Sequence, residues 1–147
     1  MKIKNYDNID YALILANHGI SKTKFRINLL NLFYDKKESL TIKEVINEFS
    51  NLINKVTIYR ALESFEEKGL IHKVPCINNL IRYSLCNSDE CNAGLHKHNH
   101  GHFICNNCKQ TFCLENYKSP DIKPVDGFYI NSLSLILEGY CKDCHLN

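Results

Sequence analysis

Apolar residues in the first half of the chain recur at the spacing of amphipathic helices. A first apolar face ends near Gly19, where a helix would stop, and the stretch TKFRINLLNLF at 23–33 predicts a second, buried helix. A third helix is expected to begin at Thr41, because Thr41 and Glu44 have the spacing of a capping box. This half of the chain therefore predicts a set of packed helices.

The fourth predicted helix fills residues 55–68 and is the most informative one. Asn54 can cap its start, and Gly69 stands where a residue in the left-handed conformation would end it. Thr57 and Arg60 fall on one face. Apolar residues recur at three-residue steps, and these either turn toward the core or follow one edge of the helix: Val56, Tyr59, Leu62 and Phe65.

Residues 70–75 and 80–85 predict two strands around a turn at Asn78 and Asn79. Helices followed by such a hairpin make a winged helix-turn-helix, whose last helix enters the major groove of DNA. The alternative is a plain helical bundle without a role in DNA binding, because capping boxes and terminal glycines are common.

The second half of the chain has a strand-like pattern. Short strands are expected at 102–105 and 110–114 around a CxxC turn, and the alternating run FYINSLSLILEGYC at 128–141 predicts a longer strand. A short helix is expected within 116–123, although this segment contains Pro120. The chain as a whole is therefore expected to be α+β.

Composition adds limits to this picture. The 147 residues are 44% hydrophobic and 23% charged, as in a globular domain, and the net charge of +2 does not by itself indicate nucleic acid binding. No apolar run approaches the roughly 20 residues of a membrane span, and Asp7 and Asp10 interrupt the start before a secretory signal could form. We expect a cytoplasmic protein that does not contact a membrane, in which the eight cysteines favour metal ligation over disulfides.

Two CxxC pairs predict a structural zinc site: Cys105, Cys108, Cys141 and Cys144. A two-residue spacer lets both sulfurs of a turn reach one ion at about 2.3 Å, and two such turns complete a tetrahedral shell. A redox role is disfavoured, because no thioredoxin-like βαβ pattern surrounds either pair.

Alternating histidines precede the first CxxC pair: His96, His98, His100 and His102. In an extended chain every second side chain lies on the same face, so these imidazoles could bind a second metal ion together. The alternative is an exposed histidine-rich loop that binds metals weakly and without a function.

The whole pattern resembles the ferric uptake regulator (Fur) superfamily. The most specific parts are TIYRALESF at 57–65, similar to the family's recognition helix, the two CxxC pairs, and the run GFYINSLSLILEGYCKDC that ends in the second pair. The resemblance implies a metal-dependent repressor that forms a homodimer and binds double-stranded promoter DNA, expected to be an AT-rich palindrome. It also implies a winged helix over 1–85, a hinge over 86–99, and a small α/β dimerisation domain with structural zinc over 100–147.

In the family, residues of the recognition helix approach thymines and the DNA backbone, which maps onto Thr57, Tyr59 and Arg60. An arginine at the start of the second helix reaches the minor groove, which maps onto Arg26. Such contacts are chemically sensible, because an aromatic surface packs against a thymine methyl and arginine suits narrow minor grooves. The alternative for Tyr59 is an aromatic side chain that faces the core.

The resemblance is strongest to the zinc uptake regulator (Zur) branch. Iron and peroxide sensors place a histidine before the third helix and a carboxylate in the strand before the hinge, whereas this chain has Leu40 and Ser84 there. His72 and Cys86 fall close to positions that resemble zinc ligands of the Zur branch. Imidazole and thiolate suit zinc better than iron, which prefers more oxygen ligands.

The expected sensing site therefore consists of His72, Cys86, His100 and His102. Other donors are kept as alternative ligands: Cys91, His96, His98, Cys113 and Glu115. An ion bound by both halves would fix the angle between them and favour the conformer that binds DNA.

Three other functions are weighed against a zinc-sensing repressor of zinc-uptake genes. The first is an iron-responsive or peroxide-sensing regulator of the same superfamily, whose regulatory metal would be iron. The second is a zinc storage or delivery protein, which leaves the winged helix without a purpose. The third, an enzyme, is not expected, because Glu115 is the only evident general base and no HExxH-type helix exists.

Overall fold

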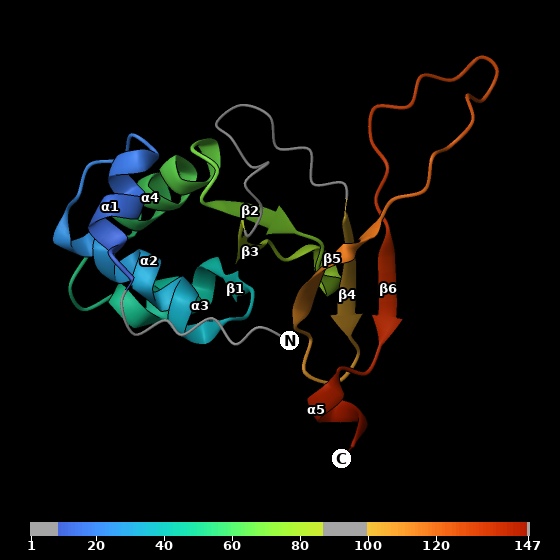
Figure 1. Cartoon of the computed structure of the whole chain (residues 1–147). Helices are drawn as coiled ribbons and strands as arrows, with labels where there is room; N and C mark the ends of the chain where they lie inside the picture. Colours follow the sequence, from blue (N-terminus) through green and yellow to red (C-terminus); the bar gives the residue numbers. More distant parts are fainter. Residues whose placement is uncertain (1–8, 87–99, 147) are drawn as a thin grey trace.

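The helices gather mainly in the first half of the chain and the longest strands in the second half, as a computed structural model shows for residues 9–86 and 100–146 (Figure 1). The first half contains α1 (Tyr11–Asn17), α2 (Lys24–Lys36), β1 (Leu40–Thr41), α3 (Ile42–Phe49), α4 (Lys55–Glu67), β2 (Ile71–Val74), the short 3-10 turn η1 (Ile77–Asn79) and β3 (Arg82–Leu85). The second half contains β4 (His100–Cys105), β5 (Thr111–Lys118), β6 (Ile136–Gly139) and α5 (Lys142–His145). Within these two ranges no helix has the length and apolar character needed to cross a lipid bilayer.

Side-chain caps fix where the helices of the first half begin. The cap residues of α1 to α4 each accept a hydrogen bond from the backbone N–H three positions on: Asp10, Thr23, Thr41 and Asn54. Thr41 and Glu44 form the complete capping box that the sequence predicts, with the Thr41 backbone N–H donating to Glu44 Oε2 over 2.6 Å. A cap of this kind stabilises a helix by about 1 kcal/mol.

The inward face of α4 forms the centre of the first core. This face carries Ile58, Ala61, Leu62 and Phe65, all of them buried. Val56 and Tyr59 are instead 58% and 49% exposed, so they lie at the edge of the helix. A step of three residues drifts around a helix with 3.6 residues per turn, which is why this row of apolar residues does not stay on the inner face.

The hairpin predicted after α4 is present and forms the wing. β2 and β3 pair in antiparallel register, with His72 opposite Ser84, and β1 adds a third strand on the other side of β3. The turn passes through Asn78, whose φ of 68° is left-handed, a conformation that asparagine tolerates well. This arrangement confirms the predicted winged helix-turn-helix.

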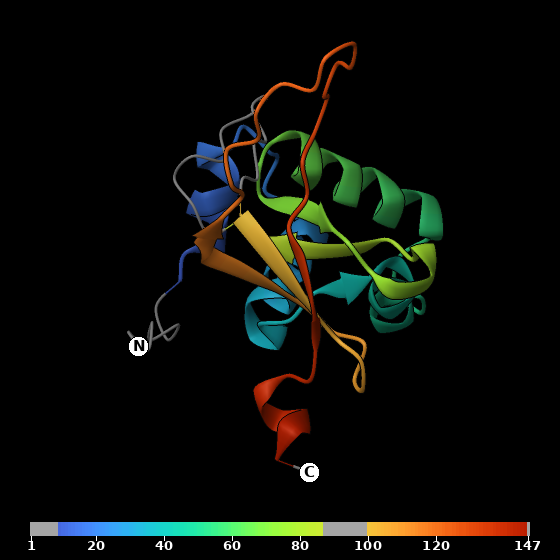
Figure 2. The same ribbon diagram turned by 90° about the vertical axis from the view of Figure 1, so that its right-hand side faces the viewer.

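The second sheet has the strand order β5-β4-β6. β4 and β5 form an antiparallel hairpin around the first CxxC turn, whereas β6 runs parallel to β4, with Cys105 opposite Gly139. Because parallel strands end at the same edge of a sheet, the second CxxC pair arrives beside the first. Figures 1 and 2 show α5 at this end of the sheet and a long loop at the opposite end.

The helix expected within 116–123 is wrong. β5 continues to Lys118, and residues 119–123 have no helical conformation. The residues around Tyr117 are extended because they pair with β4, and this pairing continues as far as His100 and Lys118. Beyond it, Pro120 and Pro124 remove backbone donors that a helix would need.

The long strand expected over 128–141 is present only in part. Residues 136–139 form β6, whereas 128–135 have no regular secondary structure and belong to the loop seen at the top of Figure 1. A strand needs a partner for its backbone groups, and among the described residues no strand pairs with 128–134, while Leu135 accepts one hydrogen bond from His102 of β4 where the pairing begins. Phe128 and Tyr129 are 76% and 89% exposed there.

Candidate metal centres

The first candidate centre brings the two CxxC pairs together. Its four sulfurs, from Cys105, Cys108, Cys141 and Cys144, all lie within 4.8 Å of one another. Cys105 ends β4 and is fully buried, and Cys141 is the residue that precedes α5. Sulfur donors at these separations match the closed shell of a structural zinc ion.

Backbone hydrogen bonds prepare one of these sulfurs for ionisation. Desolvation opposes the charged form of Cys105, but N–H groups of Cys141, Cys108 and Asn107 overcome it and lower the pKa of this thiol to about 6. Desolvation and the neighbouring sulfurs raise the pKa of the Cys108 thiol. Four thiolates so close together need a cation between them, because otherwise their charges repel.

The second candidate centre joins the two halves of the chain. It consists of His72 from β2, His100 and His102 from β4, and Cys113 from β5, whose donor atoms also lie within 4.8 Å of one another. The rings of His100 and His102 lie 4.8 Å apart between centroids, beside a register shift at the start of β4. Cys113 Sγ lies 3.4 Å from Nε2 of His72.

Cys86 lies on the far side of the His72 ring from this cluster. Its Sγ is 3.5 Å from Nδ1 of His72, whereas Cys113 lies at Nε2. Because an imidazole normally offers one nitrogen to a metal, an ion at Nε2 is reached by Cys113, and Cys86 then contacts the opposite nitrogen. The sequence favoured Cys86 as a ligand and kept Cys113 as an alternative, whereas the structure places Cys113 in the cluster.

A signal for Cys113 was present in the sequence. Once the CxxC turn is taken as the end of a hairpin, counting back from it pairs His102 with Cys113 across β4 and β5, as the structure shows. Paired residues of neighbouring strands lie on the same face of a sheet. Choosing Cys113 as a ligand therefore required the pairing register of the hairpin, and closeness in sequence to the histidines was not the right guide.

Burial keeps the two β4 histidines neutral. Desolvation lowers the pKa of His102 to about 4, with a further contribution from His100, and desolvation lowers the pKa of His100 against the opposing charge of Glu115. Nε2 of His102 is buried and has no hydrogen-bond partner within residues 9–86 and 100–146. A neutral imidazole with an uncommitted nitrogen is the form that binds metal ions, so the donor set fits a cation such as Zn²⁺.

The remaining alternative donors are placed less favourably or lie outside the described residues. Glu115 is exposed on β5 and acts on His100 through its charge, but it is not part of the cluster. Cys91, His96 and His98 lie outside the described residues.

The residues expected to contact DNA lie on two helices of the first half, α2 and α4. Thr57, Tyr59 and Arg60 are all exposed on α4, which removes the core-facing alternative for Tyr59. Arg26 lies in the first turn of α2, where its guanidinium donates to the hydroxyl and carbonyl oxygens of Ser21. The exposure of the three α4 side chains leaves them accessible to a partner as large as a DNA duplex, whereas Arg26 is half-buried.

Comparison with known proteins agrees with this fold. The model of the ferric uptake regulator family matches residues 17–135. The ferric uptake regulation protein of Bordetella parapertussis is 26% identical over 143 residues, which cover 88% of this chain and 93% of that protein. The ferric uptake regulation protein of Staphylococcus aureus is 27% identical over 139 residues, covering 92% and 96%.

Solved structures of this kind have the same fold at lower identity. The holo form of XcZur superposes with a TM-score of 0.62 at 20% identity and covers 93% of this chain and 99% of its own. A zinc uptake regulator in complex with zinc and DNA gives 0.62 at 21% identity, covering 91% and 89%. The ferric uptake regulator of Francisella tularensis with iron gives 0.55 at 23% identity, covering 86% and 96%.

Proposed function

The chain belongs to the ferric uptake regulator family, and from that premise we propose that it is a zinc-responsive repressor of zinc-uptake genes. Members of this family are metal-responsive, DNA-binding transcription regulators and not enzymes. These comparisons leave the identity of the regulatory metal to be decided, because the curated relatives are named for iron, whereas the solved structures include zinc regulators. The donor atoms of the second centre support zinc.

The single observation that carries the proposal is the composition of the cluster His72, His100, His102 and Cys113. It offers three imidazoles and a thiolate, and no carboxylate of the described residues belongs to it. Soft sulfur and imidazole nitrogen in a four-coordinate set favour Zn²⁺, whereas Fe²⁺ and Mn²⁺ favour oxygen ligands and higher coordination. We assign structural zinc to the four cysteines of the other centre.

The position of the cluster supports a role in sensing. His72 belongs to the wing, and the other donors belong to the second sheet, so an ion among them would favour one arrangement of the two halves. The resulting shift in DNA binding can be no larger than the difference in zinc affinity between the two arrangements. We retain the domain limits 1–85, 86–99 and 100–147 for this scheme.

In this scheme, the arrangement of the two halves that zinc favours is the one in which a homodimer binds DNA. We place α4 in the major groove, with Thr57, Tyr59 and Arg60 toward the bases and backbone and Arg26 toward the minor groove. Two-fold symmetry predicts a palindromic operator, and Tyr59 and Arg26 favour AT-rich sequence. A protein that binds promoters acts on the chromosome, so we place it in the cytoplasm.

The decisive experiment measures bound zinc and promoter binding while free zinc is stepped downward in a metal buffer. Two ions per chain are expected, and promoter binding should disappear with the first ion released. His72→Ala should keep one ion and lose zinc-dependent DNA binding, whereas His18→Ala, a histidine at the end of α1, should match the unchanged protein. One ion per chain, or promoter binding that follows Fe²⁺ and ignores Zn²⁺, would refute the zinc-sensing proposal.

The second candidate function is an iron-responsive regulator. The observation in its favour is Glu115, whose charge acts on His100 and which could add an oxygen ligand. The same titration with Fe²⁺ under anaerobic conditions distinguishes the two functions. An iron sensor would lose its response on Glu115→Gln, whereas the proposed zinc sensor would keep it.

A further inference from the structure

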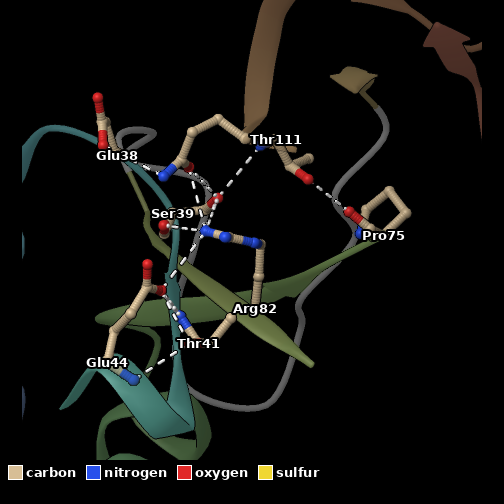
Figure 3. Close-up of polar contacts among 8 residues, drawn as sticks. Glu38, Ser39, Thr41, Glu44, Pro75, Arg82 and Thr111 are labelled. Carbon is tan, nitrogen blue, oxygen red and sulfur yellow. Dashed lines mark hydrogen bonds and ion pairs between the residues drawn. The ribbon is translucent and has the colours of Figure 1, made fainter. Parts of the chain in front are cut away.

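A group of polar side chains, most of them buried, also joins the two halves (Figure 3). Arg82 Nη1 on β3 donates to the backbone carbonyl of Ser39 over 2.6 Å and to Gln110 Oε1 over 3.2 Å. Ser39 Oγ donates to the same Gln110 oxygen over 3.0 Å. Gln110 Nε2 also donates to Glu38 Oε2 over 3.2 Å, so this one amide side chain, just before β5, is bound to three residues of the winged-helix half.

Thr111 adds a second pair of contacts across the same junction. Its Oγ1 donates to the carbonyl of Pro75 over 2.7 Å, and its backbone N–H donates to Ser39 Oγ over 3.3 Å. Pro75 directly follows β2, the strand that carries His72. We name the side chains of Ser39, Arg82, Gln110 and Thr111 the polar latch.

Burial gives the polar latch its strength. Ser39, Arg82 and Thr111 are 1%, 8% and 2% exposed. Buried hydrogen bonds are expensive to break, because a donor or acceptor that loses its partner there is not rehydrated freely. Glu44 extends the contact, with its carboxylate 3.6 Å from Arg82 Nη1, and this same carboxylate completes the capping box of α3. The latch is thereby tied to the DNA-binding helices.

The polar latch and the metal cluster share strand β5. Thr111 and Cys113 are two residues apart on β5 and therefore point to the same face of the sheet. Thr111 contacts Pro75 just after β2, and Cys113 contacts His72 within β2. Two positions of β5 thus contact the region of β2. Thr111 does so through a hydrogen bond to Pro75, and Cys113 does so as a metal donor beside His72.

We propose that the polar latch holds the wing against the second sheet without metal and thereby sets the affinity of the sensing site. The inference rests on the proposed function, because it assigns a regulatory role beside the proposed ligands. With the latch closed, His72 is already near the donors of β4 and β5, so binding the ion requires little further ordering. The bound ion then restricts the rotation of the wing relative to the second sheet, which the latch already holds together.

Two mild substitutions test the proposal on the full-length protein. Thr111→Val keeps the shape of the side chain and removes its donor, and Gln110→Ala removes the acceptor shared by Ser39 and Arg82. Asn116→Ala, which shortens an exposed polar side chain on the same strand, is the matched control. The affinity of the second zinc ion is measured by competition with a chelator on protein that holds its structural zinc.

We expect the double variant to bind the second ion about tenfold more weakly, since several hydrogen bonds of ordinary strength are lost. Structural zinc, and promoter binding at saturating zinc, should stay as in the unchanged protein, and so should all properties of Asn116→Ala. A latch that serves stability alone would lower the melting temperature and leave the second-ion affinity unchanged, and that result would overturn the proposal.

Small-angle scattering of protein that holds only structural zinc separates this proposal from the proposed function. The unchanged chain should keep its halves docked, and the double variant should expand. Equal, expanded profiles for both would overturn the latch even where zinc sensing holds. A docked chain that never binds a second ion would refute the sensor and, with it, the effect of the latch on metal affinity, although docking without metal would hold.

Discussion

His72 is the central residue of the second centre, because each of its two ring nitrogens has a cysteine sulfur beside it. Cys113 lies 3.4 Å from Nε2, on the side of His100 and His102, and Cys86 lies 3.5 Å from Nδ1. A group hydrogen-bonded to the second nitrogen of a metal-binding histidine fixes the orientation of the ring and raises its basicity. The two cysteines therefore have different expected roles, one as ligand and one as support.

This difference predicts an order of effects for two serine substitutions. Cys113→Ser should abolish tight binding of the second zinc ion, whereas Cys86→Ser should weaken it by about 10- to 100-fold, the usual effect of losing a supporting group. Both should retain structural zinc. Chelator competition measures both affinities, and Cys76→Ser, a partly buried thiol outside both clusters, is the control. A larger loss for Cys86→Ser would place Cys86 in the ligand set instead.

At the level of elements, the sequence predicts best what is encoded within a few residues. Helix starts follow from Thr41 and Asn54, whose side chains cap their own helices, and the wing hairpin follows from two apolar runs around a turn. The CxxC spacing likewise predicted a cysteine cluster that the structure assembles. Each of these features needs no knowledge of distant parts of the chain.

Features that depend on pairing between distant segments were not predictable in this way. Whether the run at 128–141 forms a strand depends on which neighbour pairs with its backbone, and the register with β4 covers 136–139. The parallel pairing of β6 with β4 joins residues more than thirty positions apart. The preference for Cys113 over Cys86 was different, because it needed only the register of the local hairpin of β4 and β5.

The cap of α4 gives a prediction at this scale. Asn54 accepts a hydrogen bond from the Thr57 N–H over 2.9 Å, and Asn54→Ala should lower the free energy of unfolding by about 1 kcal/mol. Chemical denaturation measures the loss. Asn51→Ala, an exposed asparagine in the preceding turn, should change stability by much less. An equal loss of unfolding free energy in the two variants would show that the Asn54 cap does not stabilise α4.

At the scale of the whole molecule, the described residues leave the second sheet with an open edge at β6. β6 is an edge strand, with Ile136 and Leu137 43% and 38% exposed, and the loop before it exposes Phe128 and Tyr129 almost fully. Exposed apolar side chains around an open sheet edge favour association with another chain. This surface supports the proposed homodimer and accounts for the short strand.

Phe128→Glu should therefore dissociate the proposed homodimer. The side chain is 76% exposed in the single chain, so the change should hardly affect the fold of a monomer. Analytical ultracentrifugation should detect a dimer for the unchanged protein and a monomer for the variant. Leu13→Glu, at a 56% exposed position on α1, should stay dimeric. A dimeric Phe128→Glu protein would place the interface elsewhere.

β4 carries donors of both candidate centres, with His100 and His102 in its first half and Cys105 at its end. With the cysteine centre filled, the end of this strand is anchored to β6 and α5, and the histidines upstream are held in register. Under the proposed function, loading of the two ions then has an order: a newly made chain must acquire its structural ion before its second centre can respond to a changing metal supply. During metal starvation, young chains would fail to mature, while older ones would lose only the exchangeable ion.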